Sequence, residues 1–109
     1  MPLNVQDLAR QMTAAAAGQF KKQWPDVKSY AESEFQKLAH AIVFIGEERV
    51  AGQIDETEGA LLLDMQKNAS RAVFLTIKGI GLLTAEAAVN AALDVVRTAV
   101  NTALGLTLL

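Results

Sequence analysis

The sequence predicts an all-α fold, an antiparallel four-helix bundle that forms one domain over residues 1–109. Alanine, leucine, valine, glutamate, glutamine and lysine dominate the composition, and only two prolines occur, which together favour helix over strand. Apolar residues recur every three or four positions, which is the period of an amphipathic helix. Four such segments are joined by connections of about three to five residues, a length that favours antiparallel neighbours.

The first helix is predicted over residues 5–22. Asn4 suits its N-cap, because an asparagine side chain can accept a hydrogen bond from a free backbone N–H of the first turn. The helix is expected to end before Trp24, since Pro25 disfavours helical geometry in the residue that precedes it. Pro25 in turn suits the first turn of a second helix, where its missing N–H costs nothing.

The second helix is predicted over residues 26–51, with Gly52 just beyond its end as a C-terminal signal. Gly46 lies inside this segment, and glycine is unfavourable in a helix interior. One face is continuously apolar and is expected to meet the core. Its members are Val27, Ala31, Phe35, Leu38, Ile42 and Ile45.

The third helix is predicted over residues 56–78. Asp55, with Glu58 three residues later, has the spacing of a capping box. Lys78 followed by Gly79 indicates the end of the helix. The alternative is that the helix continues through Gly79 and Gly81 into the next segment, as one rod about 75 Å long. The residues expected in the core are Leu61, Leu62, Met65, Ala69, Ala72, Val73 and Ile77.

The fourth helix is predicted over residues 84–104, with Thr84 as its cap. Its strongly polar residues fall within an arc of roughly 80°, whereas alanine, valine and leucine cover about 200°. Such a face exceeds what one small core uses, so we expect the helix to be enclosed by its own chain or by a second copy. Together with an aromatic residue of the third helix, it supplies the candidate interface residues Phe74, Val89, Leu93, Val96 and Val100.

The charge distribution and the cysteine content exclude several classes of function. Cysteine is absent, which excludes disulfides and thiolate sites and is typical of the cytoplasm, our expected location. The net charge is −2, with +2 over residues 1–31, −6 over residues 32–64 and +2 over residues 65–109. No segment has the basic density of a nucleic-acid-binding surface, and no apolar run is long enough to predict a membrane span.

The only histidine, His40, raises the question of a metal site. Carboxylate-bridged metal sites in bundles use a Glu-x-x-His pair, but Lys37 stands three residues before His40. Acidic residues crowd residues 47–58, where capping of the third helix explains several of them. The sequence therefore predicts no catalytic residue, no metal ligand and no cofactor.

Basic residues share one face of the third helix. Lys67, Arg71 and Lys78 surround Phe74 there, a pattern that can bind an anionic group or an acidic partner helix. A phenylalanine in this setting is more often covered by a neighbouring chain, which is why Phe74 is counted with the interface.

These observations predict a non-catalytic structural, assembly or adaptor protein that acts through helix–helix association. Its partner is expected to be a second copy, giving a homo-oligomer and most simply a two-fold dimer, or another helical protein. One alternative is a small carrier whose fourth helix lines a pocket for an apolar ligand. A third hypothesis is a bundle that binds a carboxylate-bridged metal.

Overall fold

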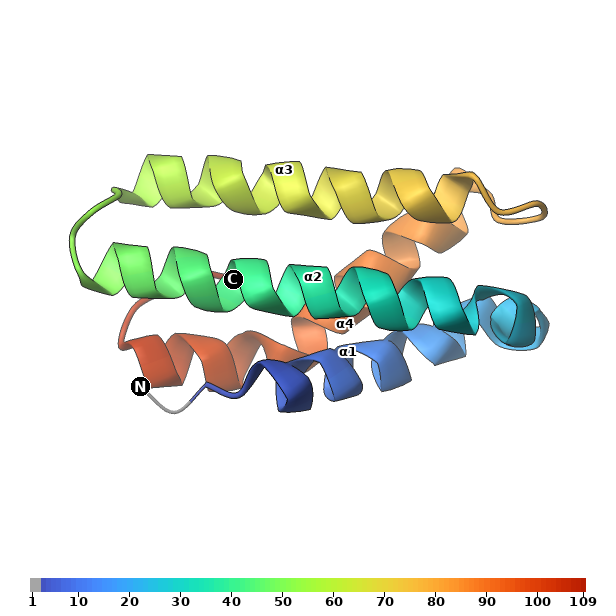
Figure 1. Ribbon diagram of the computed structural model, residues 1–109, viewed down its shortest axis with the longest axis horizontal. Helices are drawn as coiled ribbons and strands as arrows, with labels where there is room; N and C mark the ends of the chain where they lie inside the picture. The colour runs from blue at the N-terminus through green and yellow to red at the C-terminus, as the bar shows by residue number, and fades with distance from the viewer. Residues whose placement is uncertain (1–2) are drawn as a thin grey trace.

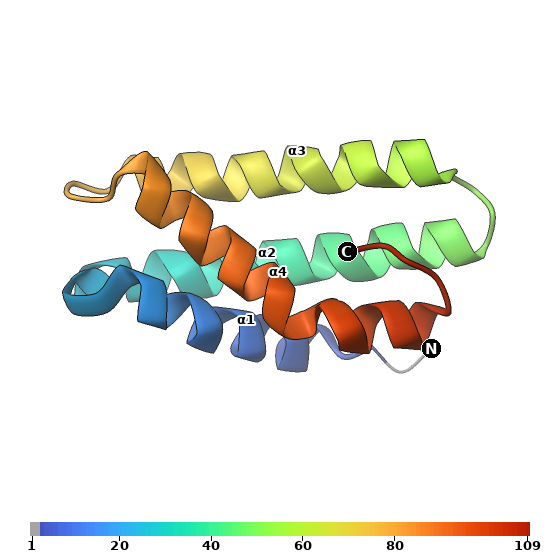
Figure 2. The same cartoon turned by 180° about the vertical axis from the view of Figure 1, so that it is seen from behind.

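The computed structural model describes residues 3–109 and shows an all-α protein, which confirms the predicted fold class. The helices α1 to α3 lie side by side with α2 in the middle, and α4 crosses them obliquely (Figures 1 and 2). The molecule measures 42 × 23 × 17 Å along its principal axes. The bounds are Val5–Phe20 for α1, Trp24–Val50 for α2, Glu56–Leu75 for α3 and Leu82–Leu104 for α4, with a 3-10 turn over Lys21–Gln23.

The oblique course of α4 distinguishes this fold from a regular bundle. Neighbours α1 and α2, and α2 and α3, run antiparallel as expected. Helix α4 starts beside the end of α3 and crosses to α1, with which it packs most extensively (Figure 2). Helix α3 is consequently covered by α2 along its length and by α4 only in part.

Two of the three predicted N-caps are confirmed. The side chain of Asn4 accepts a hydrogen bond of 3.0 Å from the backbone N–H of Asp7. Asp55 and Glu58 form the capping box, with bonds of 2.8 and 3.2 Å between each side chain and the other residue's backbone N–H. The cap predicted at Thr84 is wrong, because α4 begins two residues earlier and Gly81 occupies its N-cap position.

A hairpin joins α3 to α4, so the two helices do not form a rod. The turn places Gly79 at φ 91°, a left-handed conformation that favours glycine. The Gln23 side chain donates a 2.6 Å hydrogen bond to the Gly79 carbonyl, and a Cβ on Gly79 would collide with it. This contact ties the α3–α4 turn to the α1–α2 junction at the same end of the molecule.

The core is built mainly from α1, α2 and α4. Three phenylalanines form its aromatic centre, with the ring centroid of Phe74 lying 5.2 Å from that of Phe20 and 5.6 Å from that of Phe35. Gly46, unfavourable for helix propensity, has a packing role: a Cβ there would lie 2.8 Å from a methyl carbon of Leu104. Its missing side chain lets α4 approach α2 closely.

The core face predicted for α3 is wrong for most of its residues, although Ile77, just beyond the helix, does pack against the core. Leu61, Leu62 and Met65 point to solvent, whereas the buried residues of α3 are Gly59, Leu63, Ser70 and Phe74. Helix α3 has apolar side chains on two nearly opposite faces, and its position at the edge of the layer covers only one. The sequence contains both faces, but their relative burial depends on the tertiary arrangement.

Candidate functional site

The chain's own helices cover all five predicted interface residues. Each is buried, and the chain's own helices enclose part of the wide apolar face of α4, while Val95 on the same helix stays half-exposed. A partner could not reach these side chains without opening the core. An interface on the folded chain therefore requires other residues than Phe74, Val89, Leu93, Val96 and Val100.

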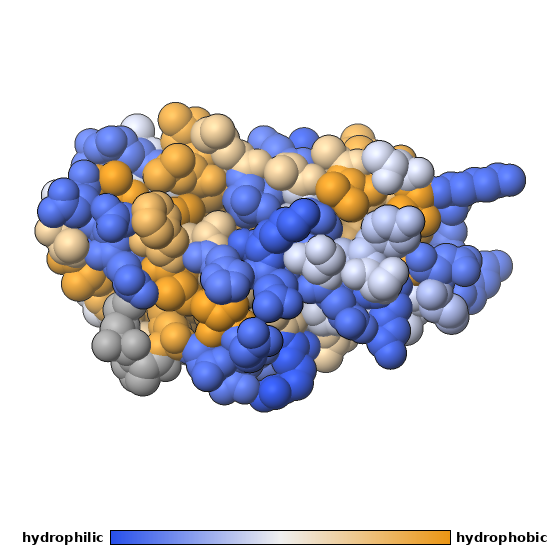
Figure 3. All heavy atoms as spheres, viewed as in Figure 1, coloured by the Kyte–Doolittle hydropathy of each residue, from blue (hydrophilic) through white to orange (hydrophobic). Residues whose placement is uncertain are grey.

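Exposed apolar side chains gather instead on α3 and the adjacent part of α2 (Figure 3). Phe44 and Leu61 are each 61% exposed, Met65 is 60% exposed, Leu75 41% and Leu62 38%. With the exposed Ala69 and Ala72 they form what we call the α2–α3 apolar face: Phe44, Leu61, Leu62, Met65, Ala69, Ala72 and Leu75.

The α3 members of this face follow a helical stripe. At 100° per residue they fall within an arc of roughly 140°, on the side of α3 away from its buried residues. Leu62, Met65, Ala69 and Ala72 are spaced three, four and three residues apart, the spacing of a helix–helix seam. The charged residues of the central part of α3 lie outside the arc.

A groove runs between α2 and α3 within this face. It encloses about 410 Å³, and Gln66 is its only polar lining residue among those the structure describes. Small residues on each wall leave room between the bulky ones. The apolar residues that line the groove are Ala41, Phe44, Ile45, Leu62, Met65 and Ala69.

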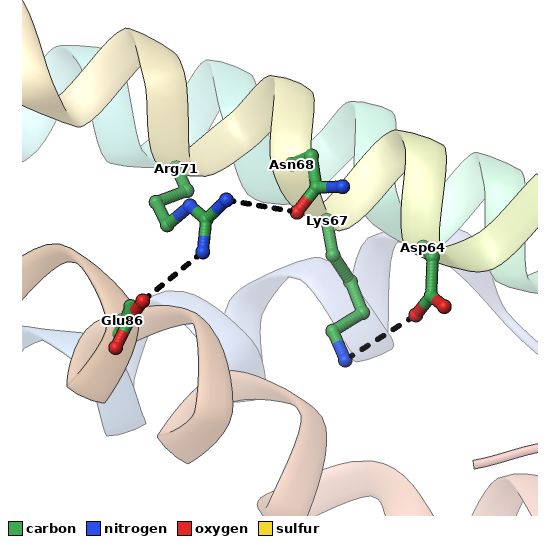
Figure 4. Close-up of polar contacts among 5 residues, drawn as sticks. All are labelled: Asp64, Lys67, Asn68, Arg71 and Glu86. Atoms are coloured by element: carbon green, nitrogen blue, oxygen red, sulfur yellow. Dashed lines mark hydrogen bonds and ion pairs between the residues drawn. The ribbon is translucent and has the colours of Figure 1, made fainter.

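The predicted basic stripe of α3 faces a polar cleft between α3 and α4 (Figure 4). Arg71 donates hydrogen bonds of 3.1 Å to the Glu86 carboxylate and to the Asn68 side-chain oxygen, and the Lys67 ammonium lies 3.7 Å from the Asp64 carboxylate. Two carboxylates thus neutralise the two cations. The cluster connects α3 to α4 and leaves no excess positive charge for an anionic ligand.

The two other residues of the predicted stripe lie elsewhere. Phe74 points into the core, away from the basic side chains, and Lys78 lies beyond the end of α3 in the exposed turn. The structure therefore does not bring the aromatic ring and the three basic residues together as one site.

His40 is exposed on α2. Across residues 3–109, no three histidine, aspartate or glutamate side chains converge in an arrangement that could hold a metal ion. In the same part of the chain, no helix is both long enough and apolar enough to cross a membrane.

Charge is divided between the two ends of the long axis. The α2–α3 turn brings acidic residues together at one end, whereas the α1–α2 junction and the α3–α4 turn bring basic residues to the other (Figure 1). The uneven charge found along the sequence thus becomes a difference between two ends. The acidic residues are Glu47, Glu48, Asp55, Glu56 and Glu58, and the basic residues are Lys21, Lys22, Lys28 and Lys78.

Comparison of the chain with known protein families, with curated proteins and with solved structures finds no match. The candidate function therefore has to be derived from the surface chemistry of the chain itself. The α2–α3 apolar face is the most distinctive part of that surface.

Proposed function

We propose that this chain is a non-catalytic assembly protein of the cytoplasm that associates with itself, most simply as a two-fold dimer, through the α2–α3 apolar face. The observation that carries the proposal is the exposure of five large apolar side chains on α2 and α3, three of which line one groove. A helix with one uncovered apolar stripe lowers its free energy by packing that stripe against another helix.

The size of the surface supports this function. At roughly 150–200 Å² for a fully exposed large apolar side chain, the five exposed fractions correspond to roughly 400–500 Å². Patches of several hundred Å² on monomers often mark interaction sites. At about 25 cal/mol per Å², covering the two patches of a dimer contributes about 20–25 kcal/mol, which exceeds an association cost of about 4–15 kcal/mol. These terms favour a reversible dimer.

A regular four-helix bundle could form between two copies of the chain. Helices α2 and α3 form an antiparallel pair whose outer groove is open. Two such pairs, one from each copy, are the components of an intermolecular four-helix bundle. We propose this arrangement in place of a regular bundle within one chain.

Sedimentation velocity over a concentration series tests self-association. We expect the mass to rise from 11.7 kDa toward twice that value, with a midpoint on the order of micromolar. Leu61→Glu should weaken association at least about tenfold, because dimerisation would bury its carboxylate. Val95→Glu is the matched control, since Val95 is a half-exposed apolar residue on α4, outside the face.

Two results would refute the proposal. One is a monomer at every concentration up to about 1 mM, which would mean that the exposed face gains too little from association. The other is equal weakening by the two glutamate substitutions, which would show that general charge, rather than this face, controls the association.

A second candidate is a carrier of an apolar ligand, favoured by the 410 Å³ groove and its apolar lining. The site would be this surface groove, because the α4 residues first expected to line a pocket are packed in the core. Mass spectrometry of the denatured protein distinguishes the candidates. A carrier would release a stoichiometric apolar compound and stay monomeric, whereas an assembly protein would do neither.

A further inference from the structure

We infer that two copies pair with their α3 helices antiparallel, each α3 lying in the α2–α3 groove of the other copy. The acidic end of one copy then meets the basic end of its partner. This inference rests on the proposed self-association and adds the orientation of the two copies, which self-association alone leaves open.

The first argument is the size of the side chains along the face. Bulky Phe44, Leu62 and Met65 gather toward the acidic end, small Ala69 and Ala72 follow, and Leu75 lies at the basic end. In an antiparallel pair Met65 of each copy meets the partner's Ala72. A parallel pair would set Met65 against the partner's Met65 and leave a gap between the two copies of Ala72, and both mismatches are destabilising.

The register follows from the same pattern. If the two-fold axis passes between Asn68 and Ala69, Met65 lies opposite the partner's Ala72 and Leu62 lies opposite the partner's Leu75. Apolar residues then face one another along the stripe. The alanines near the axis allow the two helices to approach closely where they cross.

The second argument is electrostatic. In this register Glu58 lies near the partner's Lys78, and the cluster of acidic residues around the α2–α3 turn faces the basic end of the other copy. A parallel pair would bring the two acidic clusters together, which is unfavourable because like charges repel at short range. The apolar face itself supplies no charge that opposes either orientation.

The third argument is area. Two copies of the α2–α3 apolar face remove roughly 800–1,000 Å² from water, before the alanines and neighbouring side-chain stems are counted. Specific interfaces bury about 1,000 Å² or more. A second copy is therefore a sufficient occupant for this face.

Distances between spin labels test the orientation. The chain has no cysteine, so Thr57→Cys and Ala60→Cys each provide one labelling site, both on exposed positions in the first turns of α3 that do not line the groove. In the antiparallel dimer two Thr57 labels should lie about 35 Å apart, and two Ala60 labels roughly 8 Å closer, because each residue rises 1.5 Å along each helix. In a parallel dimer both distances would be equal and about 20 Å or less.

The outcomes separate this inference from the proposed function. Long, unequal distances support the antiparallel pair. Short, equal distances overturn it but leave self-association standing. A monomer without a defined distance overturns both. A long distance at Ala60 that exceeds the distance at Thr57 also overturns the proposed register.

A charge reversal provides a second measurement. Lys78→Glu should weaken the dimer about tenfold at low salt, and the difference should shrink as salt screens the charges. Lys28→Glu is the control: it changes the net charge equally at the same end, but on the side of α2 away from the groove. Equal effects of the two substitutions would contradict the pairing of opposite ends.

Discussion

Helices α3 and α4 both carry apolar side chains around much of their circumference, but the fold uses them differently. Helix α4 crosses the layer, and the other helices cover most of its valines and leucines, while Leu82, Leu83 and Val95 stay exposed. Helix α3 lies at the edge, and only a narrow face with Leu63 and Phe74 is buried. The amount of apolar surface on a helix therefore does not determine how much of it stays exposed. The position of the helix within the fold does.

The largest expected difference between the two helices comes from introducing a carboxylate. Val96→Glu places a charge at a fully buried position of α4, and we expect it to unfold the chain, because an unpaired buried charge costs several kcal/mol. Met65→Glu, on the outer face of α3, should change the free energy of unfolding of the monomer by less than about 0.5 kcal/mol. Circular dichroism during urea titration measures both. A folded Val96→Glu variant would contradict the assigned core.

The next largest effect compares two neighbours on α3. Phe74→Ala removes a ring that contacts Phe20 and Phe35, and should cost about 3–5 kcal/mol of folding free energy. Leu75→Ala removes a side chain that is 41% exposed, and should cost less, about 1 kcal/mol, in the monomer. Urea unfolding at a protein concentration below the midpoint of the proposed dimerisation gives both values.

Other outcomes of these two substitutions would change the assignment of the inner and outer faces of α3. If Leu75→Ala were the more damaging substitution, the outer face of α3 would be the one that packs in the folded chain. If both costs were small, α3 would contribute little to the fold.

The ends of the helices are the part of this fold that the sequence predicts best, because local capping residues determine them. The helix bounds match within a few residues, because the caps at Asn4 and Asp55 act on neighbouring backbone groups and Pro25 lies in the first turn of α2. The expectation that Pro25 keeps Trp24 out of helical geometry is wrong, because α2 begins at Trp24 and the chain leaves α1 at Lys21. The prediction of Thr84 as the N-cap of α4 failed because the actual N-cap is Gly81, three residues earlier. Glycine has no side chain that could form a capping hydrogen bond, so the sequence gives no such signal there.

The side of each helix that becomes buried is not a local property. Met65 and Phe74 lie on opposite faces of α3, and both faces have helical periodicity, so periodicity alone does not choose between them. The oblique crossing of α4 decides the matter, since it leaves the Met65 face open. The stripe that forms the candidate site was therefore visible in the sequence but was assigned to the core.

The smallest predicted effect concerns the inner face of α3. Ser70 is fully buried, and its hydroxyl has no hydrogen-bond partner among the residues that the structure describes. Ser70→Ala should stabilise the chain by about 1–2 kcal/mol, because it removes a desolvated hydroxyl and adds a better helix former. Ser33→Ala is the matched control, since Ser33 is exposed within α2 and gains only the propensity of about 0.5 kcal/mol. Thermal unfolding of both variants measures the difference. A smaller gain at Ser70 than at Ser33 would mean that the Ser70 hydroxyl makes a hydrogen bond in solution. The inner face of α3 would then not be fully desolvated.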